Sequence, residues 1–103
     1  MLLAVAAGTV GVFDVIEQAG DGFDSLKAIG LRQLLLASPE MTRSRAEAIL
    51  AYVGREAQGM SAVHETVRWV LNDRHFANGL RLRLLRAAVA HGVPLPLKDP
   101  FDA

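Results

Sequence analysis

The chain contains no cysteine. This absence excludes disulfide bonds, catalytic thiolates and zinc sites with sulfur ligands. Nothing in the sequence therefore points to an oxidising compartment.

Long apolar runs are also missing. No stretch approaches the roughly 18 apolar residues that span a bilayer. The apolar start Met1–Ala7 lacks a basic leader and is followed by Gly8, so we interpret it as a packed or frayed terminus rather than a targeting segment. We expect a cytoplasmic protein without a membrane partner.

Net charge is absent too, because 11 Lys and Arg balance 11 Asp and Glu. The charges are nevertheless unevenly placed. Residues 1–40 hold five acids and two bases, a balance of −3, whereas residues 41–97 hold eight bases and four acids, a balance of +4. Such asymmetry hints at an anionic partner, although a balance of +4 alone fits a solvated helix face better.

No sustained period-two pattern predicts a strand, and helical spacing dominates. With 103 residues and 51% apolar content, we expect one domain over residues 1–97 and a tail over residues 98–103. The fold class is all-α, a compact bundle of about five short helices. The expected elements are Val10–Gln18 capped by Thr9, a turn over Leu26–Ile29, Leu31–Ala37, a helix from Thr42 or Ser44 to about Glu56, Ala62–Leu71 capped by Ser61, and Gly79–Ala90 capped by Asn78.

Catalytic patterns are absent as well. The histidines at 64, 75 and 91 are too far apart to share a helix face as metal ligands, which requires a spacing of three or four. No glycine-rich phosphate loop is present, and each serine suits a cap or a turn. Asp21 and Asp24 lie together in a loop, where carboxylates commonly stabilise turns. We therefore predict a protein that is not an enzyme, with no metal and no cofactor.

The most informative stretch lies around the helix that begins near residue 43. Arg43 and Arg45 stand where a helix dipole favours anions, and Ser44 and Glu47 have the spacing of a capping box. Cations beside unpaired backbone N–H groups make a seat for phosphate. The alternative is that both arginines point to water while Glu47 relieves their repulsion.

The last expected helix also carries a basic face. Arg83 and Arg86 share a face with Ala87 and Ala90, whereas Arg81 lies elsewhere on the helix, near Ala88. A separate apolar face comprises Leu82, Leu85 and Val89. This pattern suits a helix that contacts a DNA backbone, and it suits an ordinary amphipathic helix too.

The segment from Gly8 to Val53 resembles the helical, actinobacterial type of integration host factor. The matching residues are Gly8-Thr9, the helix Val12–Ala19, Leu31-x-x-Leu34-Leu35-x-Ala37-x-Pro39, Met41-Thr42-x-Ser44-Arg45-Ala46 and Ile49-Leu50, with Gly79-Leu80, Arg81, Arg83 and Leu84-Leu85 later. The chain departs from the family in its apolar start, where the family has a basic helix, and in Thr42, where glycine is usual.

The resemblance implies a helix-two-turn-helix core that binds duplex DNA through its phosphate backbone. Its implied role is architectural, in nucleoid organisation or phage recombination. The implied DNA-binding residues are Thr42, Arg43, Ser44, Arg45, Arg81, Arg83 and Arg86.

A second hypothesis remains open, namely a small module that binds a partner protein or itself. Zero net charge favours it, as do an exposed apolar start, Met1–Val5, and the proline-bounded tail Pro94–Pro96. Trp69 fits either a core position or an interface anchor.

Overall fold

The structure is a computed structural model that describes residues 5–8, 10–72 and 79–93. The protein is all-α, as predicted, and no strand occurs within these ranges. The elements are α2 (Val12–Gly20), the 3₁₀ helix η1 (Asp24–Ala28), α3 (Leu31–Ala37), α4 (Arg43–Gln58), α5 (Val67–Leu71) and α6 (Leu80–His91). Within the described residues, no helix combines the length and the hydrophobicity that a membrane span requires.

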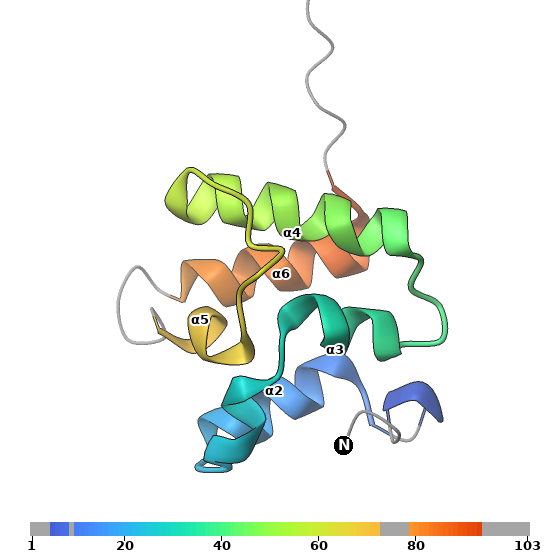
Figure 1. The fold of residues 1–103 in the computed structure, drawn as a ribbon, viewed down its shortest axis with the longest axis vertical. Coiled ribbons are helices and arrows are strands. Elements are labelled where there is room, and N and C mark those ends of the chain that lie inside the picture. The colour runs from blue at the N-terminus through green and yellow to red at the C-terminus, as the bar shows by residue number, and fades with distance from the viewer. Residues whose placement is uncertain (1–4, 9, 73–78, 94–103) are drawn as a thin grey trace, which may run out of the picture.

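The two longest helices, α4 and α6, lie side by side and run antiparallel, so the beginning of α4 meets the end of α6 (Figure 1). The shorter helix α3 packs against α4, and α2 packs against η1 and α5. This arrangement places the start of α4 at one end of the helix pair.

The core is built on the stripe of α4 that sequence periodicity predicts. Ala46, Ile49, Leu50 and Val53 are fully buried, because a spacing of three and four keeps them on one helix face. They belong to one core with the buried residues of the other helices, which include Leu31, Leu34 and Leu35 of α3, Val67, Trp69 and Val70 of α5, and Leu85 and Ala88 of α6. Trp69 is therefore a core residue.

The helix expected over Ala62–Leu71 was predicted too long, since α5 begins only at Val67. Ser61 caps a turn instead, its Oγ accepting a hydrogen bond from the Val63 amide at 3.3 Å. Around the start of α5, the backbone forms hydrogen bonds with the segment before α3 instead of helical hydrogen bonds. The Leu31 amide donates to the Glu65 carbonyl and the Val67 amide to the Ile29 carbonyl, both at 2.9 Å.

The capping box predicted at Ser44 was wrong. Thr42 is the N-cap of α4, with its Oγ1 accepting from the Arg45 amide at 3.2 Å, and Ser44 is the second helical residue. The Glu47 side chain takes no part in capping the helix and forms an ion pair with Arg32 instead.

Other helix limits also differ from expectation. The first helix starts at Val12 rather than Val10, and the amide of the preceding Gly11 donates to Asp14 Oδ2 at 2.9 Å. The turn predicted over Leu26–Ile29 is the 3₁₀ helix η1, which begins two residues earlier, at Asp24, and ends at Ala28. The last helix follows Gly79. The predicted caps Thr9 and Asn78 lie outside the described residues.

The expected exposure of Met1–Val5 is not found at Val5, the one residue of this segment that the structure describes. Val5 is buried in the core and only 2% exposed. The rest of that segment and the Pro94–Pro96 tail lie outside the described residues.

Candidate nucleic-acid interface

The start of α4 has the local features that favour anion binding at a helix N-terminus. Thr42 is extended and caps the helix, and the first turn contains no acidic residue. The first main-chain hydrogen bond of the helix runs from the Ala46 amide to the Thr42 carbonyl, at 2.9 Å. The amides of Arg43 and Ser44 precede that bond, so they are among the N–H groups that a helix leaves without internal acceptors. They form the positive end of a helix of 16 residues.

The two arginines of this turn have different roles. Arg45 Nη2 donates to the Val89 carbonyl at 2.7 Å, which ties the start of α4 to the end of α6. The Arg43 side chain is exposed and forms no hydrogen bond or ion pair with any other residue in the described part of the chain. Arg43 is therefore the cation at this turn that is available to a ligand.

The nearest acidic residue along α4 is paired with a basic residue. Glu47 lies one turn after Arg43, and its Oε1 accepts from Arg32 Nη2 at 3.0 Å. Both side chains are partly exposed, so the pair adds little to stability. It does cancel a negative charge that would otherwise lie behind Arg43. The other acid near this turn, Glu40, is exposed in the preceding loop.

The arginines of α6 are divided between the surface and internal contacts. Arg83 is exposed, as are Ala87 and Ala90, so the predicted stripe does face solvent. Arg86 on the same stripe contacts α2, where its Nη2 meets Glu17 Oε1 at 2.9 Å and its guanidinium lies 4.9 Å from the Phe13 ring centre.

Arg81 serves the core instead. Its guanidinium stacks 4.5 Å from the centre of the Trp69 ring, and its Nη1 donates to the Trp69 carbonyl at 2.9 Å. Trp69 Nε1 in turn donates to Gln58 Oε1 at 2.8 Å. These contacts place Arg81 at the end of the α4–α6 pair remote from Arg43 (Figure 1).

The structure thus does not bring the seven candidate residues together on one site. Thr42, Arg43 and Ser44 form one exposed turn, to which Arg45 adds a structural link. His91 ends α6 two residues after Val89 and is exposed at this same end. Sequence reasoning missed His91, because only the antiparallel pairing of α4 with α6 brings it there.

Neither a metal site nor a known relative supplies a further clue. Within the described residues, no three side chains of the metal-binding types come together. Comparisons of the chain with protein-family models, curated proteins and solved structures give no match.

Proposed function

We propose that this protein binds duplex DNA through the phosphate backbone, with the first turn of α4 as the principal contact. The observation that supports this proposal is an exposed Arg43 on a capped helix start that carries no acid, with no partner for its side chain among the described residues. The resemblance to helical integration host factors points to the same turn and to an architectural or recombination role.

The chemistry of such a contact follows from the backbone. A phosphate oxygen at the start of α4 accepts hydrogen bonds from the amides of Arg43 and Ser44 and meets the positive end of the helix dipole. The Arg43 guanidinium adds a charge-assisted hydrogen bond. None of these groups reads a base edge, so the binding discriminates poorly between sequences.

The alternative is a protein-interaction module, and two exposed side chains favour it. Phe23, before η1, is 60% exposed, and Met60, after α4, is 66% exposed. Large apolar side chains in water are common singly, so these two carry less weight than the charged turn.

A matched pair of variants tests the DNA proposal. Arg43→Ala removes the proposed phosphate contact, whereas Arg55→Ala removes the same charge from the far end of α4, where Arg55 Nε donates to the Ala51 carbonyl of its own helix. Fluorescence anisotropy with a labelled duplex of about 30 base pairs at low salt measures the affinity. We expect about a tenfold loss for Arg43→Ala, which corresponds to about 1.4 kcal/mol.

Arg55→Ala should weaken binding far less than Arg43→Ala. Equal losses for the two variants would show that only net charge matters and would contradict a specific contact at the α4 start. Absence of binding by the folded wild-type protein at low salt would reject the DNA function and leave the protein-interaction alternative.

A further inference from the structure

A cavity of about 250 Å³ lies between α2, α5 and α6, on a different part of the molecule from the α4 start. Its lining residues are Ile16, Glu17, Asp21, Leu71 and Leu82. Ile16 is fully buried, so the cavity reaches the core. For comparison, an engineered cavity of about 150 Å³ holds benzene. This space can therefore hold a small organic group.

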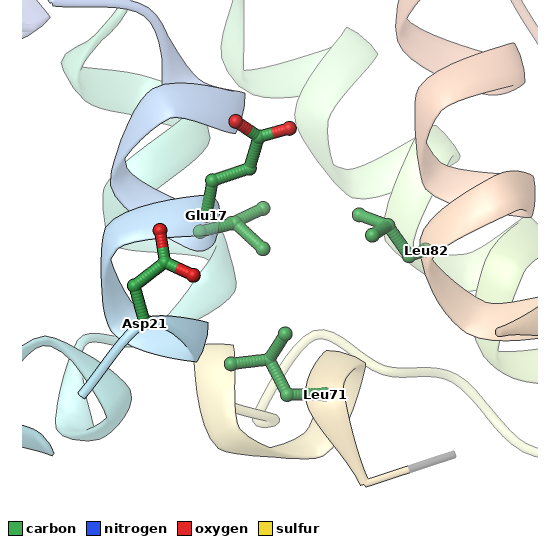
Figure 2. A pocket seen from close by; sticks show the side chains of 5 residues that line it. Glu17, Asp21, Leu71 and Leu82 are labelled. Carbon is green, nitrogen blue, oxygen red and sulfur yellow. The ribbon is translucent and has the colours of Figure 1, made fainter. Parts of the chain in front are cut away.

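The cavity has one acidic side and one apolar side. Glu17 lies on α2, and Asp21 is the C-cap residue one turn later. Figure 2 shows their carboxylates on one side of the space, with Leu71 of α5 and Leu82 of α6 on the other sides. Both carboxylate residues are exposed, so the acidic side opens to water.

The charge of the cavity is negative even after its internal pairing. Glu17 Oε1 accepts from Arg86 Nη2 at 2.9 Å. The Asp21 carboxylate has no such partner among the described residues. Two acids and one arginine leave one negative charge beside an apolar wall, so the cavity repels phosphate and attracts a cation.

We propose that this cavity binds a linear alkylammonium group. The methylene chain lies against Ile16, Leu71 and Leu82, and the ammonium meets Asp21 and the second oxygen of Glu17. Lysine side chains divide in this way at protein surfaces, with the stem on apolar atoms and the head in a polar setting. The source of the group is either a free amine or a lysine of another protein.

Chemical-shift titration by NMR tests this inference on the intact chain. The probes are n-butylamine as its hydrochloride, n-butanol as a neutral probe of the same length, and Nα-acetyl-lysine methylamide as a lysine within a peptide. Asp21→Asn removes the unpaired charge at nearly constant shape. Glu56→Gln, an exposed acid on α4, is the control for a change in net charge.

We expect saturable shifts at Asp21, Leu71 and Leu82 with n-butylamine, at least tenfold weaker binding to Asp21→Asn, and unchanged binding to Glu56→Gln. Binding of the lysine derivative with similar affinity would identify a lysine as the source, and binding of n-butylamine alone would identify a free amine. The proposal is overturned if n-butylamine gives no saturable shift, or if n-butanol binds equally well. DNA binding is measured with separate variants, so either proposal can fail without the other.

Discussion

At the scale of single residues, Gly54 marks a position where any side chain would meet backbone atoms of a neighbouring segment. Gly54 is buried in α4, where the loop after this helix crosses it closely. The Ala62 amide donates to the Leu50 carbonyl at 3.1 Å in the same crossing. A side chain at position 54 would overlap the backbone of Met60 and Ala62, so glycine is required there for close approach rather than for backbone freedom.

Gly54→Ala should therefore destabilise the protein even though alanine favours helices. Because the obstructing atoms belong to the backbone, we expect a loss of about 1–3 kcal/mol in the free energy of unfolding. Urea denaturation followed by Trp69 fluorescence measures it. Gly30→Ala is the matched control, since a Cβ at Gly30 would make only an ordinary contact with Gln33 at 3.9 Å. Similar stabilities of the two variants would disprove the close crossing.

Thr42 and Ser44 provide a second comparison of single residues. Thr42→Ala removes the hydroxyl that caps α4 and should cost about 1 kcal/mol in the free energy of unfolding. Ser44→Ala leaves the cap intact at an exposed site and should change stability by less than about 0.5 kcal/mol. Thermal denaturation by circular dichroism separates the two, and the reverse order would restore the capping box at Ser44.

At the scale of elements, sequence periodicity predicts what depends on neighbours along the chain. Helix α3 has the predicted limits, and the stripe of α4 from Ala46 to Val53 is buried as expected, because both follow from local spacing. The start of α5 was missed because its backbone pairs with residues far back in sequence, through the bridge of Gly30 with Thr66. No local pattern contains that information.

The arginines illustrate the same limit for the candidate site. Sequence spacing correctly placed Arg83 and Arg86 on an exposed face of α6. It could not show that Arg86 meets Glu17 or that Arg45 reaches Val89, since these contacts join residues 69 and 44 positions apart. The exposed turn at Arg43 was thus recognisable from the sequence. The contacts of Arg45 and Arg86 with other helices were not.

The link between α4 and α6 leads to a prediction that separates structure from binding. Arg45→Ala removes the hydrogen bond to the Val89 carbonyl and should lower the free energy of unfolding by about 0.5–1.5 kcal/mol. Arg43→Ala should leave stability unchanged to within about 0.5 kcal/mol, because its side chain is exposed. Chemical denaturation of both variants tests the difference. An equal loss from Arg43→Ala would mean that this arginine also has a structural role.

At the scale of the whole molecule, charge is balanced overall, so placement decides what the surface attracts. The chain has equal numbers of acidic and basic residues, yet the first turn of α4 lacks acids and the cavity beside α2 carries an excess of them. A neutral protein of this kind gains little from long-range steering by net charge. If the protein binds DNA as proposed, its affinity should therefore depend on a small number of short-range phosphate contacts.

Glu40 tests this dependence on local charge. Its exposed carboxylate lies in the loop two residues before Thr42 and repels a phosphate bound at the α4 start. Glu40→Gln should therefore tighten DNA binding by about two- to fivefold at low salt, with a smaller gain at high salt because of screening. Anisotropy titrations at two salt concentrations measure this. Weaker binding by Glu40→Gln would place the phosphate elsewhere.

The most direct test of the central claim is the salt dependence of wild-type binding to a labelled duplex. Each phosphate contact made by a cationic side chain contributes about −0.9 to the slope of the logarithm of the binding constant against the logarithm of salt concentration. We predict a clearly negative slope that Arg43→Ala makes shallower by about one unit. No binding at low salt, or binding whose slope Arg43→Ala leaves unchanged, would contradict phosphate recognition by the first turn of α4.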